Sequence, residues 1–403
     1  MTENISFFKD EALESNLLRL SKHLGFDCFS DFAEEIRSQL KYEYYDVAGA
    51  FPLELKRINV YHAQVTSNLR IRALMLIDRI QGRTQSELLT IALLHSKAVY
   101  SPHYKALFRN GADYPYSFIR PNTTPVCPHC LVESVYIRHY WQLVPYKACH
   151  IHECELVHVC NKCQQMLNYQ LSENIEYCQC GQKLADISSN DATKSALMVS
   201  RWLVGESCFG MGLLAEPLDL SIRYGVLLWY VNRYGDEDNF QFDDFIRYSE
   251  AWPNSLYEDL DKLVASGEQR RIRRWNRTFF HEVFNSLLKD CRHLPSRQLK
   301  ANPVLQAVLQ YLTQLVAKSP RDKCGNVADI LLSILDVSTL LSCTTEEVYR
   351  LYDHGLLTSS VQNSLHSKLP SHQSVFHLRS VIELKLSRMC SSADGSTIYL
   401  SDW

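Results

Sequence analysis

The segment CPHCLVESVYIRHYWQLVPYKACHIHECELVHVCNKC spans residues 127–163, and CQCG follows at residues 178–181. Eight of the fourteen cysteines fall within these two segments. A secreted disulfide scaffold is short and spreads its cysteines, whereas this chain has 403 residues. Cysteines clustered beside histidines are typical of a metal site, because two side chains on one tight turn reach the same tetrahedral ion.

The spacing of these pairs predicts two structural zinc ions per chain. The first set of ligands is Cys127, Cys130, Cys149 and His152. The second set is Cys160, Cys163, Cys178 and Cys180. Four protein ligands leave no open position on the ion, so both sites are expected to be structural rather than catalytic. Each ion could contribute on the order of 10 kcal/mol to the folding of a module this small.

Three further side chains lie close enough in sequence to compete for a place in the first set. They are His129, His150 and Cys154. We exclude Cys154 because the C-x-x-H pair is complete without it and a fifth ligand would be unusual. A zinc deaminase is also excluded, because its histidine and glutamate precede the cysteine pair and this order is reversed here.

Helical patterns dominate outside the cysteine region. Leu13, Leu17, Leu20 and Leu24 recur at helical spacing, and Gly25 is a plausible C-cap. A second run covers residues 68–80, and the capping-box sequence of residues 84–87 then opens another helix. We therefore expect the first 120 residues to be helical. The pair formed by these last two runs is either a helix-turn-helix or an ordinary helical hairpin.

A second capping box occurs in DVSTLLSCTTEEVYRLYDHGLL, residues 336–357, where Thr344 precedes Glu347 by three positions. The pattern predicts a further helix-turn-helix. The candidate contact residues on its second helix are Thr345, Tyr349 and Arg350. A DNA-reading helix presents donors from its first turn, but Glu346 and Glu347 would repel phosphates there. The pattern thus favours protein contact over DNA contact.

A basic run, SGEQRRIRRWNRTFF, covers residues 266–280. Its five arginines are Arg270, Arg271, Arg273, Arg274 and Arg277. They could grip RNA or another phosphate, with Trp275 stacking on a base. Alternatively, they form a solvated helix face paired with the acidic residues Glu258, Asp259 and Asp261. The sequence leaves both interpretations open.

Composition narrows the class of protein. The hydrophobic fraction of 46% fits a folded chain, and 403 residues predict two to four domains. The net charge of −3 argues against a protein that coats nucleic acid non-specifically. The start carries no signal-peptide pattern and no segment is apolar enough to span a bilayer, so we expect a cytoplasmic protein without membrane contact. No catalytic motif and no phosphate-binding glycine loop is recognisable, which predicts that the protein is not an enzyme.

These patterns together predict a mainly α fold. The expected domains are an N-terminal helical or helix-turn-helix domain at residues 1–121, a tandem zinc-binding module with short β-hairpins at 122–190, a helical domain at 191–325, and a helix-turn-helix-like domain at 326–403.

The cysteine region resembles the zinc-binding part of the TniQ family of transposon target-selection proteins. The shared opening C-P-x-C-L-x-E is present as Cys127, Pro128, Cys130, Leu131 and Glu133. The shared aromatic stretch is present as Tyr136, Arg138 and Trp141, and the later positions as Cys149, His152, Leu156, Cys160 and Cys163. Length and the segments at 201–203 and 252–253 are most similar to the short TniQ proteins of CRISPR-associated transposons.

This resemblance implies a non-enzymatic adaptor in the bacterial cytoplasm. Short TniQ proteins form a head-to-tail homodimer that docks on the type I-F CRISPR surveillance complex, Cascade, with its guide RNA. They help recruit the AAA+ transposition regulator TnsC, and they reach target DNA indirectly. The alternative is a stand-alone DNA-binding protein that recognises a fixed attachment site or acts as a regulator.

Overall fold

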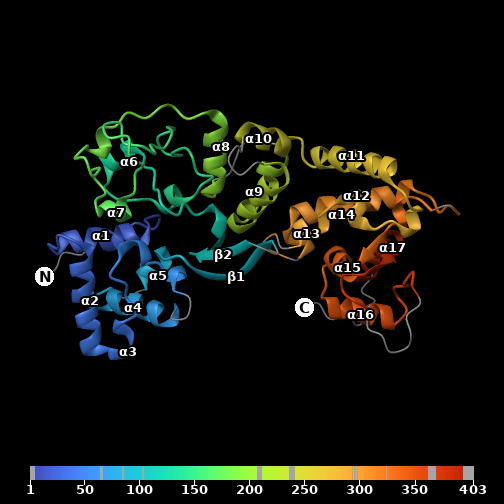
Figure 1. The fold of residues 1–403 in the computed structure, drawn as a ribbon, viewed down its shortest axis with the longest axis horizontal. Coiled ribbons are helices and arrows are strands. Elements are labelled where there is room, and N and C mark those ends of the chain that lie inside the picture. The colour runs from blue at the N-terminus through green and yellow to red at the C-terminus, as the bar shows by residue number, and fades with distance from the viewer. Residues whose placement is uncertain are drawn as a thin grey trace.

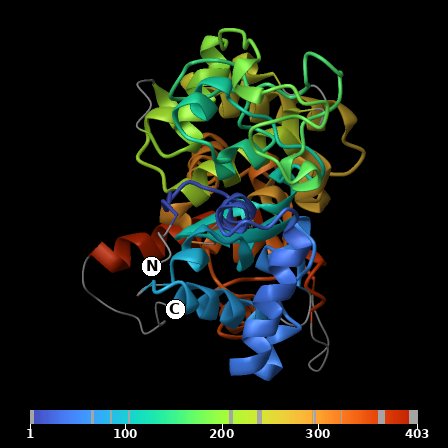
Figure 2. The same cartoon turned by 90° about the vertical axis from the view of Figure 1, so that its left-hand side faces the viewer.

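The structure is a computed structural model, and it describes residues 5–63, 67–83, 86–101, 104–206, 211–235, 241–292, 294, 296, 298–323, 325–361 and 369–393. The molecule is elongated, with the first helices and the cysteine region at one end and the last helices at the other (Figure 1). Seen along its length, the cysteine region lies above the N-terminal helices (Figure 2). The mainly α class that the sequence predicts is confirmed.

The N-terminal helices are α1 (Leu13–His23), α2 (Phe29–Glu43), α3 (Tyr45–Ala48), α4 (Ser67–Ile80) and α5 (Glu87–Ile91). The predicted end of α1 is confirmed, because Gly25 has a φ of +83° and its N–H donates to the carbonyl of Lys22. Leu13 and Leu17 are fully buried as the pattern predicts, whereas Leu24 is 44% exposed.

The predicted N-terminal helix-turn-helix stays a prediction. Its second helix, α5, has five residues, and Thr84 and Gln85 of the expected capping box lie outside the described residues. Asp78, which lies outside the predicted capping box, caps the start of α5. Its buried carboxylate accepts from the backbone N–H of Leu88 at 3.0 Å. Arg83 pairs with the same carboxylate at 3.2 Å.

The expectation that the first 120 residues are helical is wrong for residues 94–115. They form an antiparallel sheet of β1 (Leu94–Ser101), β2 (Tyr104–Arg109) and β3 (Ala112–Pro115). The turn between β2 and β3 consists of Asn110 and Gly111, with φ values of +46° and +84°. Two central residues with positive φ make a turn whose twist matches that of the strands, so an Asn-Gly pair favours a hairpin here.

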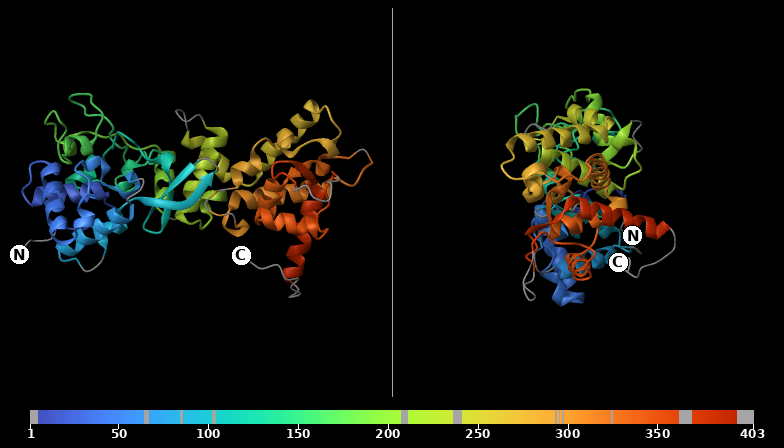
Figure 3. Two further views of the ribbon diagram at one scale, coloured as in Figure 1. Left: turned by 60° about the horizontal axis from the view of Figure 1, so that its bottom comes forward. Right: turned by 90° about the vertical axis from the view of Figure 1, so that its right-hand side faces the viewer.

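This sheet lies in the middle of the molecule, between its two ends (Figure 3). Helix α9 (Leu220–Tyr234) packs on β3, where the rings of Tyr114 and Tyr224 are 4.8 Å apart. The backbone N–H of Asp113 donates to the hydroxyl of Ser221 at 2.9 Å. The sheet thus joins the cysteine region to the helices that follow it.

The central and later helices are α6 (Pro128–Glu133), α7 (Tyr169–Ser172), α8 (Lys194–Leu203), α10 (Phe242–Glu250), α11 (Asn254–Arg270), α12 (Phe280–Phe284), α13 (Leu287–Cys291) and α14 (Pro303–Lys318). Trp252 and Pro253 lie between α10 and α11, as expected for a proline, which interrupts a helix. In the part of the chain that the structure describes, every helix is too short or too polar to cross a membrane.

The last elements are β4 (Leu331–Ser333), α15 (Ile334–Leu341), α16 (Thr345–Asp353), β5 (Ser374–His377) and α17 (Leu378–Ala393). The capping box at the start of α16 is confirmed, since Thr344 Oγ1 accepts from the N–H of Glu347 at 3.2 Å. The side chains of Glu346 and Arg350 are exposed, and Tyr349 donates its hydroxyl to the carbonyl of Leu369 at 2.5 Å. Use of this pair as a helix-turn-helix stays a prediction.

Candidate metal centres

The predicted metal ligands sit on tight turns of two kinds. Cys127 and Cys130 flank the start of α6, where Pro128 occupies the first helical position. The other ligand pairs lie in short loops, each closed by an isolated antiparallel bridge. These bridges are Ala148 with Glu155, Val159 with Met166, and Tyr177 with Lys183. The short hairpins predicted for this module are thus present as minimal ones, each with a ligand pair in its loop.

Local backbone conformation shapes these loops. Glu153 and Gln164 have φ values of +55° and +58°, and Gly181 has +81°. In each loop the N–H of the first ligand cysteine donates back across the hairpin, for example from Cys149 to the carbonyl of Cys154 at 2.8 Å. Such turns hold both ligands of a pair on one side of the loop, because they reverse the chain within a few residues.

The first cluster brings together the four residues that the spacing predicts. The ligand atoms of Cys127, Cys130, Cys149 and His152 all lie within 4.8 Å of one another. The Sγ atoms of Cys130 and Cys149 are 3.6 Å apart. Nδ1 of His152 lies 3.3 Å from the sulfur of Cys130 and 3.6 Å from the other two sulfurs.

These separations fit a tetrahedral zinc ion. Bonds of about 2.3 Å to sulfur and about 2.0 Å to nitrogen give tetrahedral edges of about 3.8 Å between sulfurs and about 3.5 Å between sulfur and nitrogen. The three cysteines are almost fully buried, so the set is shielded from solvent. Thiolate and imidazole are the donors that zinc prefers in structural sites. With four ligands, the ion would keep no site for a substrate.

A carboxylate orients the histidine of this cluster. Oε1 of Glu133 lies 3.0 Å from Nε2 of His152, while the Nδ1 atom of that ring faces the sulfurs. A carboxylate on the distal nitrogen fixes the tautomer and raises the basicity of the metal-binding nitrogen. Burial lowers the pKa of His152, but the contacts with Glu133 and Cys149 together outweigh it and raise this pKa above its ordinary value. Sequence reasoning placed Glu133 in the family motif but gave it no role.

Replacing Glu133 by Gln should weaken metal binding at the first cluster by about 10- to 100-fold, the usual effect of losing such a partner. A competition titration against a chromophoric chelator measures this constant. Glu153→Gln is a matched control, because Glu153 adjoins His152 in sequence but its carboxylate pairs with Arg201. Equal effects of the two variants would mean that the 3.0 Å contact does not support the metal.

The structure separates the three competing side chains from the first set. The Nδ1 atom of His150 is 2.8 Å from the hydroxyl of Tyr146 and is occupied there. His129 packs its ring 5.6 Å from that of His152. The thiol of Cys154 lies 3.5 Å from the sulfur of Cys127, so it is a neighbour of one ligand rather than a member of the group of four.

The second cluster also assembles as predicted, from Cys160, Cys163, Cys178 and Cys180. The sulfurs of Cys160 and Cys180 are 3.7 Å apart, and those of Cys163 and Cys178 are 3.6 Å apart. Each cysteine of the tight C-x-C pair therefore lies at a tetrahedral distance from one cysteine of the C-x-x-C pair. Three of these residues are partly exposed, which makes this cluster more accessible than the first.

The cysteine region is fastened to the residues that precede α1. The N–H of Ala12 donates to the carbonyl of Ile137 at 2.8 Å, and that of His139 donates to the carbonyl of Asp10 at 2.8 Å. The guanidinium of Arg138 pairs with the carboxylate of Asp10. Burial lowers the pKa of His139 well below its ordinary value, so this ring stays neutral in the interface. The backbone hydrogen bonds and the ion pair of this junction all join residues that are more than 100 positions apart in the sequence.

Buried acidic groups extend this junction. The carboxylate of Glu11 accepts from Ser15 at 2.7 Å and pairs with Arg19 at 2.8 Å. The carboxylate of Glu14 accepts from the amide of Asn59 at 2.6 Å. Burial raises the pKa of both carboxyl groups above their ordinary value. These contacts are internal, so the structure gives the two glutamates a structural role.

The arginine run differs in part from the prediction. Helix α11 ends at Arg270, so the other arginines do not form a helix face. Trp275 is 7% exposed and cannot stack on a base, because its ring is buried under the guanidinium of Arg271 at 4.8 Å. Asp259 and Asp261, the proposed acidic partners, contact Lys262, Tyr234 and Tyr311 instead.

The structure is thus a mainly helical protein with two groups of four residues, each of which could hold a metal ion. Residues 4–156 match the family model TniQ. The matched segment contains α1, the sheet and the whole first cluster, and it ends before the second cluster. The predicted resemblance is therefore confirmed over these residues. No protein with a curated description matches the chain.

Proposed function

We propose that this protein is a non-enzymatic adaptor that selects the target of a transposition system. The observation that carries the proposal is the match of residues 4–156 to the TniQ family, a match that includes the four residues of the first metal cluster. TniQ proteins act in transposon target selection. The closed ligand sets support a scaffold role, because neither leaves a coordination position for chemistry.

In the finer form of this proposal, the protein acts as a head-to-tail homodimer. The dimer docks on type I-F Cascade with its guide RNA and recruits TnsC for RNA-guided DNA integration. Two features support a role in protein contact. The molecule is elongated, with the N-terminal helices and the cysteine region at one end and helices α15 to α17 at the other (Figure 1). The first turn of α16 presents the exposed carboxylate of Glu346, which suits a basic protein surface better than DNA.

The test is capture of the full-length protein by Cascade assembled on a guide RNA. We expect a stable complex containing two copies of the 46.6 kDa chain by mass photometry. We expect docking at the end of Cascade that holds the guide RNA's 3′ handle. Cascade that lacks the subunit at this handle is therefore the control, and it should capture much less. Equal capture by both complexes, or none by either, would overturn the docking proposal.

The second candidate function is a stand-alone DNA-binding protein, favoured by the two packed helices α15 and α16 with a confirmed capping box. A gel shift with naked duplex DNA separates the candidates. An adaptor should bind duplex only in the non-specific range, with Kd of roughly 1–100 µM at physiological salt. A sequence-specific regulator should bind its site with Kd of about 10 nM or below.

A further inference from the structure

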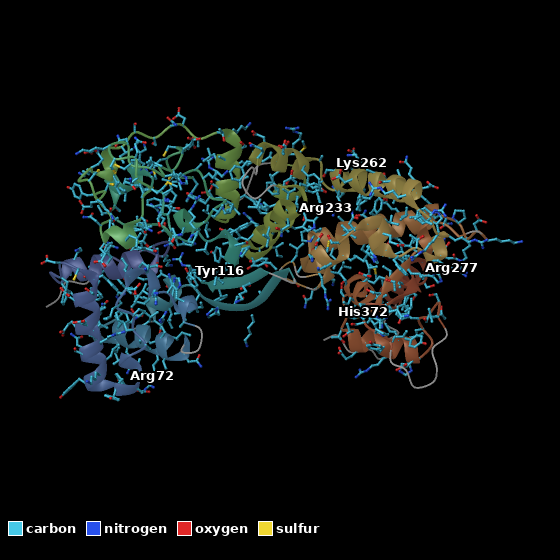
Figure 4. All side chains as sticks on the ribbon, viewed as in Figure 1. Arg72, Tyr116, Arg233, Lys262, Arg277 and His372 are labelled. Carbon is cyan, nitrogen blue, oxygen red and sulfur yellow. The ribbon has the colours of Figure 1, made fainter. Side chains whose placement is uncertain are left out.

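A large hollow lies in the C-terminal part of the molecule, far from both metal clusters. Its volume is about 1310 Å³. It opens between the segment that follows α11 and the β4–β5 pair, and its labelled members Arg277 and His372 both lie at this end of the molecule (Figure 4). The charged and aromatic residues that line it are Arg273, Arg274, Arg277, Phe279, His281, His372 and His377.

The lining carries one sign of charge. Among the described residues that line the hollow there are three arginines and three histidines, and none is Asp or Glu. The nearest acidic contact of the run is Glu282, whose carboxylate is 3.9 Å from Arg273. Asp259 and Asp261 of α11 accept from the hydroxyl groups of Tyr234 and Tyr311 and not from these arginines, so they do not neutralise the positive charge that faces a ligand.

The segment that carries the arginines is anchored to the core of the molecule. Trp275, in the 3-10 turn η7 (Trp275–Arg277), is buried and anchors the segment to the core. The hydroxyl of Thr278 donates to the carbonyl of Arg274 at 3.1 Å. The N–H of Leu331 donates to the carbonyl of Thr278 at 2.8 Å, which ties the segment to β4. Less conformational entropy is therefore lost when a ligand binds.

An aromatic side chain completes the wall. Phe279 is half-buried and borders the hollow. The ring of His281 is stacked on it at 5.6 Å with an interplanar angle of 25°, and the guanidinium of Arg273 lies 5.3 Å from its centroid. Cationic groups beside an aromatic ring are the combination with which proteins bind the backbone and bases of single strands.

We propose that this hollow binds the phosphate backbone of a single-stranded nucleic acid. Arg274 and Arg277, for which the described residues supply no ion-pair partner, contact phosphates, and the Phe279–His281 pair contacts a base. The volume exceeds the roughly 300–1,000 Å³ of a small-molecule pocket, which favours a polymer segment. A concave hollow suits a flexible strand better than a duplex, whose phosphates lie on the outside of a rigid cylinder.

This inference does not depend on the transposition role, because it concerns binding of a free strand by the isolated chain. Fluorescence anisotropy with a labelled oligo-uridine, an oligo-thymidine of the same length and a matched duplex measures it directly. The double variant R274E/R277E should weaken single-strand binding by about tenfold or more at low salt. The slope of log K against log salt should become shallower by about 1.4, or 0.7 for each lost phosphate contact.

The matched control is R247E/K262E, which makes the same change of charge on exposed side chains of α10 and α11. Lys262 lies on α11, away from His372 (Figure 4). This control should bind single strands within twofold of the unaltered protein, and both variants should keep its circular dichroism. Preference for RNA over DNA, or equal binding of the two, supports the proposal. Tighter binding of duplex, equal loss in the control, or no binding of either strand overturns it.

Discussion

Replacing Cys130 by Ser should reduce the metal content of the protein from two zinc ions per chain to one. The Cys130 sulfur is 3.3 Å from the ring of His152 and 3.6 Å from the Cys149 sulfur, so it stands at one corner of the first tetrahedron. Serine is a poor ligand for zinc, and the remaining three residues would bind the ion far more weakly. Inductively coupled plasma mass spectrometry measures the stoichiometry and identifies the metal.

The same variant should lose much of its stability. A structural zinc ion contributes on the order of 10 kcal/mol to a small module, so the melting temperature should fall by roughly 10 °C or more. Removing zinc from the unaltered protein with a strong chelator should reproduce this loss of stability. This second experiment tests the prediction even if the Cys130 variant does not fold. Returning zinc should restore the original melting temperature.

Cys28→Ser is the matched control for this experiment. The thiol of Cys28 is partly exposed and lies 3.1 Å from the hydroxyl of Ser30, away from both clusters. This variant should keep two zinc ions and nearly its full stability. A metal content of two in the Cys130 variant would show that another thiol replaces it, and Cys154 would be the first candidate.

The second large effect is expected at Arg109. Its guanidinium is buried and donates to three carbonyl groups, those of Ile91 at 3.1 Å, Lys9 at 3.0 Å and Glu11 at 2.8 Å. Replacing Arg109 by Met would leave these buried acceptors without their donor. We expect a loss of about 3–5 kcal/mol in the free energy of unfolding, as for other broken buried charge networks.

Urea unfolding of the zinc-loaded protein measures this loss as a lower midpoint with an unchanged slope. The control is Arg72→Met on α4, because Arg72 is half-exposed and its partner Asp46 is 61% exposed. Such a surface pair contributes about 0–1 kcal/mol. If the two variants unfolded at the same urea concentration, the buried guanidinium would not fasten the N-terminal segment to the sheet.

Local signals in the sequence predicted the parts of the structure that depend on a few neighbouring residues. The two ligands of each metal-binding pair belong to one tight turn. They are therefore only a few positions apart and can be recognised as a motif in the sequence. The capping box of Thr344 with Glu347 is equally local and is confirmed. The Asn110-Gly111 turn was also visible, and it was the available signal for the sheet that the helical interpretation missed.

Other features arise only from the tertiary structure. The contact of Glu133 with His152 joins residues 19 positions apart, and the bonds of Arg109 to Lys9 and Glu11 span about 100. Burial of Trp275 depends on the core beneath η7, because an aromatic residue among arginines looks like a stacking platform in sequence alone. The hollow of the C-terminal part joins Arg277 to His372 and is likewise invisible in the sequence.

The fastening of the N-terminal segment has a consequence for synthesis on the ribosome. Ala12 and Ser15 find their partners at Ile137, whose backbone accepts from one and donates to the other. The first helix thus emerges more than 100 residues before the chain that completes its hydrogen bonds. Until then, the buried carboxylates of Glu11 and Glu14 have to stay hydrated. A nascent fragment that ends before the first cysteine pair should therefore lack stable tertiary structure. Zinc binding should coincide with the packing of the N-terminal helix against the cysteine region.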